Sequence, residues 1–278
     1  MDLGKRFHSR SHEEIIRYSS GRILGTLIDF IITFFLFGSF TAMVAGTGAL
    51  FNQQLNLPSS VGNILMAVIT ASTVMTGITG VINSISIVVP FLLTVVISTS
   101  IISFFNSPLD VNDAAILYAS YNIIISVAVL GPLGSEAKDN SSIRNGAVLG
   151  GLGLGLSAIM IYLALSWNIT EIAHFEVPML IIAGRISYTA QIAYAVVLIA
   201  EIYTTAVGAL YGFTSRITDI QSYPVKGRIF IVLITIAALL ASQFGFSNIV
   251  RYLYPAVGYG GIIMLVCLII SKLDNKNQ

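Results

Sequence analysis

The sequence has few of the residues from which metalloproteins, disulfide-stapled domains and nucleic-acid-binding proteins are built. It contains one cysteine and three histidines, which leave no disulfide framework and no Cys/His spacing typical of a metal site. Charged residues make up 10% of the chain and the net charge is +1, so no basic field indicates a nucleic-acid partner. No G-x-x-x-x-G-K-[ST] loop for ATP is present. We therefore expect no cofactor and no metal.

Apolar residues in long runs dominate the sequence instead. Hydrophobic residues make up 55% of the chain and the mean hydropathy is +0.87, which is typical of a membrane protein. The first twenty residues are polar and lack a signal-peptide core, so the first span would direct insertion. We predict an all-α polytopic membrane protein of about eight transmembrane helices. Its predicted spans are approximately 24–50, 60–79, 83–105, 112–133, 145–166, 186–213, 229–244 and 248–270.

Lysine and arginine residues are distributed unevenly between the segments that connect these spans. If the N-terminus is cytoplasmic, twelve basic residues lie inside and only Arg185 and Arg251 lie outside. This bias predicts a multi-pass protein of the plasma membrane with both termini in the cytoplasm. The predicted divisions are a cytoplasmic segment (1–22), a single transmembrane helical domain (23–271) and a cytoplasmic tail (272–278). The sequence does not indicate an oligomeric state.

Glu201 is the one formally charged residue between Arg185 and Arg216. Fifteen residues separate it from the first arginine and fourteen from the second, so each flank spans roughly 22–24 Å in a straight helix. The carboxyl group would then lie near the bilayer midplane, where an acid costs about 2.5–3.5 kcal/mol or more. Such an acid either handles an ion or a proton, or is a structural residue bonded to a neighbouring helix. We favour the first interpretation, because intramembrane acids usually mark transport pathways.

Hydroxyl groups surround this acid along the helix. Thr204 and Thr205 follow Glu201 by three and four residues and Tyr194 precedes it by seven, so all lie on or beside one helical face. Threonine oxygens are ligands that hard cations prefer, and they also relay protons. The alternative is that the threonines bond the carbonyl groups of their own helix. We predict a coupling-ion or proton site at Glu201, Thr204 and Thr205, with Tyr194 a candidate for the substrate cavity.

Two further groups of polar residues lie at membrane depth. Ser120, Tyr121 and Asn122 stand at the centre of the fourth predicted span and are candidates for the substrate cavity. An asparagine there needs partners, which either a break in the helix or an interhelical bond supplies, and composition does not decide between them. Asp29 lies seven residues beyond Arg22, where it can snorkel or pair with a basic residue. We therefore rank it as a second intramembrane acid, below Glu201.

The fifth predicted span contains five glycines, several of them in small-xxx-small spacing. Gly146 and Gly150 form one such pair, and Gly151 and Gly155 form another. These spacings permit close helix crossings, so we predict that this span packs tightly on another helix.

Several stretches of the sequence resemble the YkvI-like family of bacterial membrane proteins, which is similar to the amino acid–polyamine–organocation transporter superfamily. The resemblance covers nearly all of the chain, and its most specific part is AEIYTTAVGALYGF (200–213). The other matching stretches are 10–51, NSISIVVPFLL (83–93), SYNIIISVAVLGPLG (120–134) and EVPML (176–180). The family implies an architecture and a transporter-like mechanism more than a substrate.

The architecture implied by this resemblance is a five-plus-five inverted repeat of ten helices, in which the first helix of each repeat is discontinuous. Family members begin with two further spans, so this sequence resembles helices three to ten. The resemblance implies either a misassigned start codon or a natural truncation. It also makes the fourth predicted span the first helix of the second repeat, which favours a break at Ser120–Asn122.

Two functions agree with these features. The first is an H⁺- or Na⁺-coupled secondary transporter for a small solute such as an amino acid or amine, with Asn122 and its neighbours contacting the substrate. The alternative is a non-transporting membrane protein, namely a sensor, a partner subunit or a truncated inactive transporter. We do not expect an enzyme, because the sequence has no His/Asp metal cluster, no Ser–Lys pair at depth and no paired midplane acids.

Overall fold

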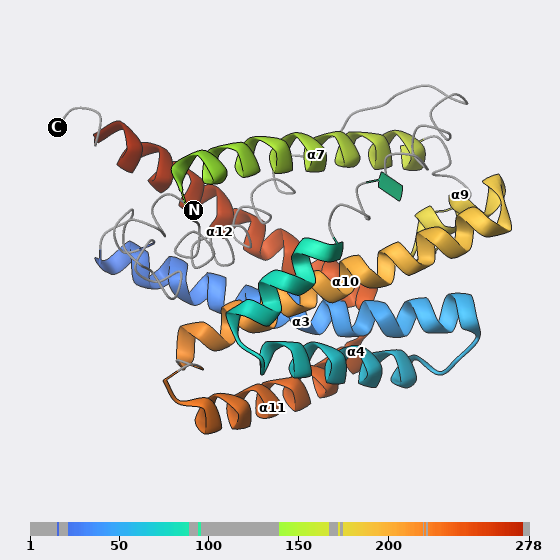
Figure 1. Cartoon of the computed structure of the whole chain (residues 1–278), viewed down its shortest axis with the longest axis horizontal. Coiled ribbons are helices and arrows are strands. Elements are labelled where there is room, and N and C mark those ends of the chain that lie inside the picture. The colour runs from blue at the N-terminus through green and yellow to red at the C-terminus, as the bar shows by residue number, and fades with distance from the viewer. Residues whose placement is uncertain are drawn as a thin grey trace.

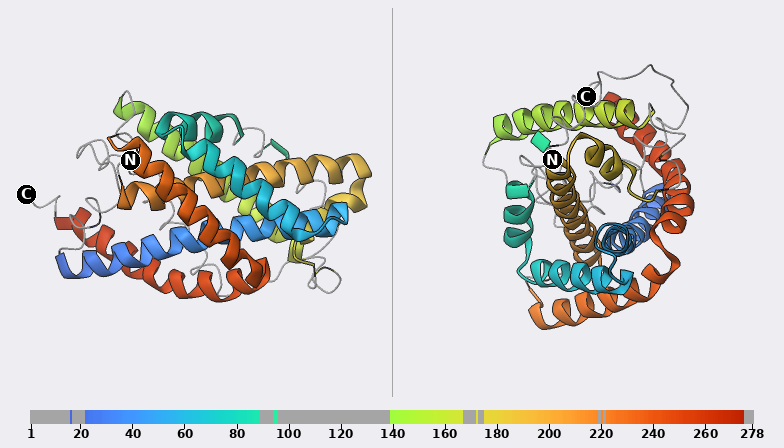
Figure 2. Two further views of the ribbon diagram at one scale, coloured as in Figure 1. Left: turned by 90° about the horizontal axis from the view of Figure 1, so that it is seen from below. Right: turned by 90° about the vertical axis from the view of Figure 1, so that its right-hand side faces the viewer.

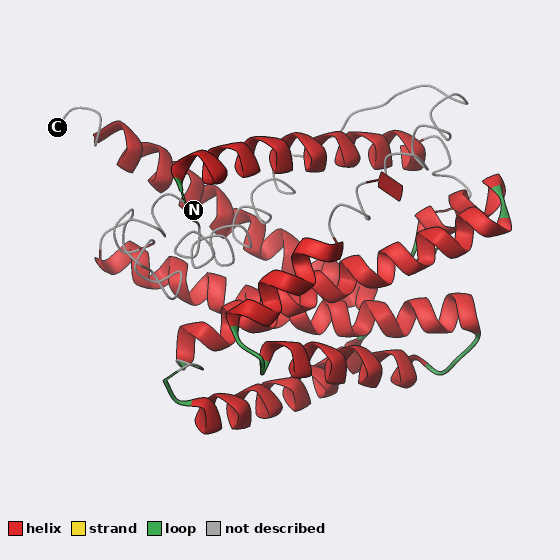
Figure 3. Cartoon of the chain, viewed as in Figure 1, coloured by secondary structure: helices red, strands yellow, loops and turns green. Residues whose placement is uncertain are grey.

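The computed structural model describes residues 16, 22–88, 94–95, 139–166, 172, 175–218, 220 and 222–274. Within these residues every regular element is a helix, and the all-α class is confirmed (Figures 1 and 3). The helices are α3 (Arg22–Leu55), α4 (Ser59–Val74), a further helix over Ile78–Val88, α7 (Asn140–Ser166), α9 (Pro178–Ile186), α10 (Tyr188–Ile217), α11 (Pro224–Ala241), the 3₁₀ turn η1 (Ser242–Phe244) and α12 (Phe246–Asp274).

Four helices of the described part are long and apolar enough to cross a membrane. They are α3, α7, α10 and α11 extended through η1, and each overlaps a span predicted from the sequence. α4 and Ile78–Val88 are shorter apolar helices, while α12 has 29 residues and contains Pro255. The predicted span 112–133 lies outside the described residues. The count of eight spans therefore stays a prediction.

The predicted second span, 60–79, is wrong at its C-terminal end. α4 ends at Val74, and the chain turns before a new helix begins at Ile78. Gly77 in this turn has φ of +81°, a left-handed conformation that glycine adopts without a Cβ clash. Apolar residues continue through the turn, so hydropathy alone did not reveal it. The helix begins five residues before the predicted third span, at Ile78 instead of residue 83.

α3 and α10 occupy the interior of the helical assembly. Figure 2 shows them surrounded by α4, α7, α11 and α12 when the molecule is seen end-on. In the most apolar stretch of each helix, 44% of α3 and 39% of α10 is buried, against 28% of α11 and 17% of α7. The outer helices present large apolar side chains to their surroundings, as expected for a surface in contact with lipid acyl chains. α3 and α10 are thus the more deeply packed helices of the described part.

Two polar contacts fix the register of α3 against α10. Asp29 of α3 binds Arg216 of α10 at one end, and Gln191 Nε2 of α10 donates to Gln54 Oε1 of α3 at 3.0 Å at the other. Asp29 and Gln54 are 25 residues apart, and so are Gln191 and Arg216, so the two helices run antiparallel and in step. This spacing corresponds to about 37 Å, which exceeds a hydrocarbon core of about 30 Å. The two polar pairs can therefore lie at opposite membrane surfaces.

α3 and α4 cross with their backbones in contact. A Cβ atom added at Gly62 would lie 2.7 Å from the carbonyl oxygen of Thr47 and 2.9 Å from the Cα of Gly48. One added at Gly48 would collide with Oδ1 of Asn63. Any side chain at either glycine would push the helices apart, which is the role of small residues in membrane helix crossings.

Four glycines of α7 have no close crossing with the part of the chain that the structure describes. A Cβ atom at Gly146, Gly150, Gly151 or Gly155 would meet none of the described residues within 4 Å. Leu149 and other large apolar side chains between these glycines are also exposed. The spacing makes a close crossing possible, but it does not supply the second helix.

Candidate functional site

Glu201 lies near the middle of α10, thirteen residues after Tyr188 and sixteen before Ile217. The helix begins where Ser187 Oγ accepts a hydrogen bond from the backbone N–H of Ala190 at 3.0 Å, an N-cap of the usual kind. Beyond the acid, every residue from 206 to 210 is buried. Glu201 itself is exposed, although its helix is an interior one. The acid therefore stands where α10 passes from accessible to fully packed surroundings.

The carboxylate of Glu201 makes no hydrogen bond and no ion pair with any residue that the structure describes. The alternative interpretation, a structural acid bonded to a neighbouring helix, thus finds no partner in these parts of the chain. An accessible carboxylate without a fixed counter-charge can take up a proton or a cation from water.

The two threonines differ in what their hydroxyl groups do. Thr204 Oγ1 donates to the backbone carbonyl oxygen of Glu201 at 3.0 Å, which is the alternative that we considered for it. Its side chain is buried, and its hydrogen is committed to the helix. Thr205 is half-buried, and its hydroxyl makes no hydrogen bond to the described residues. Thr205 is therefore the better placed oxygen ligand of the two.

Tyr194 lies two turns before Glu201 and is buried at 4% exposure. It belongs to an apolar cluster with Leu180 and Ala183 of α9 and Val197 of α10. The ring packs between α9 and the neighbouring residues of α10. The other substrate-cavity candidates, Ser120, Tyr121 and Asn122, lie outside the described residues.

Tyr203 forms a polar contact that the sequence did not predict. Its hydroxyl lies 2.7 Å from Thr73 Oγ1 of α4 and donates to Ser84 Oγ at 3.2 Å. These bonds join α10 to α4 and to the Ile78–Val88 helix, close to Glu201 along the chain. Ser84 lies within that helix, which begins at Ile78. The sequence could have indicated this contact, because it places three hydroxyl-bearing residues in separate apolar helices. Hydroxyl groups in such helices commonly form hydrogen bonds with one another.

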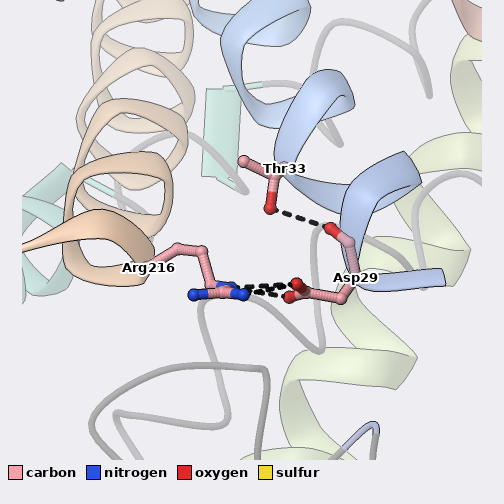
Figure 4. A network of polar contacts seen from close by, with 3 residues as sticks. All are labelled: Asp29, Thr33 and Arg216. Carbon is pink, nitrogen blue, oxygen red and sulfur yellow. Dashed lines mark hydrogen bonds and ion pairs between the residues drawn. The ribbon is translucent and has the colours of Figure 1, made fainter. Parts of the chain in front are cut away.

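Asp29 forms an ion pair with a basic residue, which is one of the two outcomes that we predicted for it. Arg216 Nε donates to Oδ1 and Oδ2 of Asp29 at 2.9 and 3.0 Å, and Nη2 donates to Oδ2 at 2.7 Å (Figure 4). The Asp29 side chain is 9% exposed and that of Arg216 is 26% exposed. Thr33 Oγ1 donates to the backbone carbonyl oxygen of Asp29 at 2.8 Å, so it bonds its own helix. This guanidinium–carboxylate geometry suits a fixed contact between α3 and α10.

Apolar helices of spanning length, an interior antiparallel pair and lipid-type outer surfaces define an all-helical integral membrane protein. The chain is 26% identical over 293 residues to the "Uncharacterized membrane protein YkvI" of Bacillus subtilis (strain 168), covering 100% of the chain and 83% of YkvI. It is 27% identical over 287 residues to the "Uncharacterized protein YyaD" of the same organism, covering 99% of the chain and 83% of YyaD. These homologues confirm the resemblance to the YkvI-like family. No family model matches the chain.

Proposed function

We propose that this protein is a secondary transporter that couples H⁺ or Na⁺ to the movement of a small solute such as an amino acid or an amine. The observation that carries the proposal is the accessible carboxylate of Glu201, which has no ion pair with the described residues, in the middle of an interior helix. An acid at this depth is costly unless it meets water, a proton or a cation. Exchange of that partner is the chemistry of ion coupling.

The depth of Glu201 supports this role. It lies ten residues from Gln191 and fifteen from Arg216, so the two polar contacts that bracket α10 are about 15 Å and 22 Å away along the axis. A proton on the carboxylate, or Na⁺ beside it, would neutralise the charge inside the hydrocarbon region. Thr205 supplies a further oxygen in the next turn of the helix. The side on which the carboxylate is accessible can then depend on whether it is neutralised, which links ion binding to a change of conformation.

The proposal places the protein in the plasma membrane as a multi-pass protein with both termini cytoplasmic. It rests on the twelve-to-two distribution of basic residues and agrees with the antiparallel pairing of α3 and α10. In this orientation α3 begins at the inner surface, and Asp29 and Arg216 lie near that surface. The junction of α3 with α4 lies at the outer surface.

Transport by purified protein in liposomes tests the proposal. Vesicles containing a pH-sensitive dye, or loaded to follow ²²Na⁺, are exposed to a panel of amino acids and amines. We expect at least one solute to drive H⁺ or Na⁺ across the membrane, and Glu201→Gln to abolish gradient-driven accumulation while leaving solute exchange. Asp139→Asn, an acid-to-amide change at the exposed start of α7, is the matched control and should transport normally.

Full gradient-driven accumulation by Glu201→Gln would remove Glu201 from the coupling mechanism. If no solute in the panel moves either ion in the unmodified protein, the non-transporting alternative replaces the proposal.

A further inference from the structure

A second polar site lies away from Glu201, at the ends of α3, α4 and α11. A cavity of about 570 Å³ opens there between the C-terminal part of α3, the start of α4, η1 and the segment before α9. All of these ends belong to the predicted outer surface. The volume is within the range of small-molecule sites and far larger than one inorganic ion needs. The residues that matter for its chemistry are Gln53, Asn63, Phe175, Glu176, Ser242 and Phe246.

Asn63 lines this cavity and has an unsatisfied acceptor on its side facing α3. Its Nδ2 donates to Ser242 Oγ at 3.1 Å, and Ser242 Oγ in turn donates to the carbonyl oxygen of Leu239 at 2.8 Å. Because the serine hydrogen is committed to Leu239, the asparagine must be the donor in the first bond, and its oxygen is the atom left over. Asn63 is 5% exposed, and Oδ1 has no hydrogen-bond partner among the described residues. The absence of a side chain at Gly48 leaves the room that this oxygen occupies.

Gln53 brings a second unsatisfied amide. Its Nε2 is buried without a hydrogen-bond partner in the described part of the protein. Rotation about the last side-chain bond exchanges nitrogen and oxygen, so Gln53 can offer a donor or an acceptor to a ligand. Buried polar groups are normally bonded, and each one left open costs about 1–3 kcal/mol. Two residues with unbonded amide atoms line this one cavity, which suits a polar ligand.

The charged and aromatic residues of the lining indicate which class of ligand suits the cavity. Glu176 is the one charged residue among the described residues of the lining, and its Oε1 accepts a hydrogen bond from Ser247 Oγ at 2.8 Å at the exposed rim. None of the lining residues that the structure describes is basic, so they offer no counter-charge to an anion. Phe175 and Phe246 add aromatic surface, which attracts organic cations. A protonated amine carries three N–H donors and one positive charge, which match the acceptors and the carboxylate.

We propose that this cavity is a binding site for a small solute that carries a protonated amine. The inference goes beyond the transport proposal, because it concerns a separate site and requires no ion gradient. Glu176 supplies the counter-charge, the Gln53 amide offers its oxygen to an N–H group after rotating toward the cavity, and the two phenylalanines contact the carbon skeleton.

Ligand-observed NMR titration of the purified protein in detergent micelles tests the site. The probes are propylammonium, propionamide and propionate, which are similar in size and differ in charge. We expect saturable binding of propylammonium, with the other two at least tenfold weaker. Glu176→Gln should weaken propylammonium binding at least fivefold, whereas Gln53→Glu should tighten it at least threefold by adding a second carboxylate. Asp139→Asn is the control for a lost negative charge elsewhere and should bind normally.

Three results would overturn the inference: no saturable binding of propylammonium, equal binding of the three probes, or unchanged affinity in Glu176→Gln. Glu176 is exposed and Gln53 is half-buried. A thermal melt of each variant verifies that it is folded. The result is also separable from transport. Loss of coupling in Glu201→Gln with intact propylammonium binding, or the reverse, distinguishes failure of one proposal from failure of the other.

Discussion

Asp29 and Glu201 are the two acids on the two interior helices, and the structure gives them opposite surroundings. Asp29 is buried, and Arg216 holds it through three hydrogen bonds. Glu201 is accessible and has neither an ion pair nor a side-chain hydrogen bond to the described residues. A fixed counter-ion makes an acid part of the scaffold, whereas an acid without one is available to a mobile ion. Position along the helix ranked Asp29 below Glu201, and the ion pair with Arg216 supplies the physical difference between the two acids.

The largest effect that we expect from this comparison is functional and specific to Glu201. Glu201→Gln should reduce gradient-driven accumulation at least tenfold without a loss of thermal stability, because it removes a charge that no described residue balances. Asp29→Asn should retain coupling. Uptake and melting temperature measured on the same liposome and detergent samples check both statements. Equal loss of coupling in the two variants would erase the distinction between the acids.

The second effect is on stability and is specific to Asp29. Asp29→Ala leaves Arg216 without this carboxylate, and we expect a loss of about 1–3 kcal/mol, between the values for exposed and fully buried pairs. The double variant Asp29→Ala/Arg216→Ala should lose less than the sum of the two single variants, since no charge is stranded. Denaturation in mixed micelles measures all three. An additive result would show that the pair contributes no coupling energy.

The third effect concerns the threonines beside the two acids. Thr205→Val should weaken the dependence of transport on cation concentration about twofold to tenfold, if its hydroxyl contributes an oxygen to the ion at Glu201. Thr33→Val is the matched control, because Thr33 only bonds the backbone carbonyl of Asp29. Uptake at varied Na⁺ and pH provides the readout. An identical response of both variants would leave Thr205 without a role in coupling.

The smallest effect is expected at Tyr203. Tyr203→Phe removes the hydroxyl that contacts Thr73 and Ser84 and should cost about 0.6 kcal/mol and at most about 1.7 kcal/mol, the mean and the maximum for interhelical hydrogen bonds in a membrane protein. Because these bonds tie α10 to α4 and to Ile78–Val88, the variant should also increase hydrogen exchange in that helix. Tyr188→Phe, at the exposed start of α10, is the control. No difference between the two would mean that the contact does not hold α10 in place.

The sequence was sufficient to predict the helical class, the α10 helix and the place of Glu201 near the middle of that helix, because all three follow from local hydropathy and from charges close along the chain. It was not sufficient to identify Arg216 as the partner of Asp29, since 187 residues separate them and any nearby cation satisfied the same expectation. The glycines show the same limit. Those of α7 had the conspicuous spacing, whereas the backbone contact formed at Gly48 and Gly62, because a close crossing depends on two surfaces that meet.

The separation of Asp29 from Arg216 has a consequence for synthesis of the protein. A ribosome adding 5–20 residues per second needs roughly 10–40 s to pass from the acid to its partner. During that interval α3 enters the bilayer with its carboxylate exposed to whatever water and lipid headgroups are near. Asp29 stands about 10 Å along the helix from Arg22, which keeps it within reach of that polar layer. We therefore expect α3 to insert before Arg216 is synthesised, and the arginine to bind a helix that is already in the membrane.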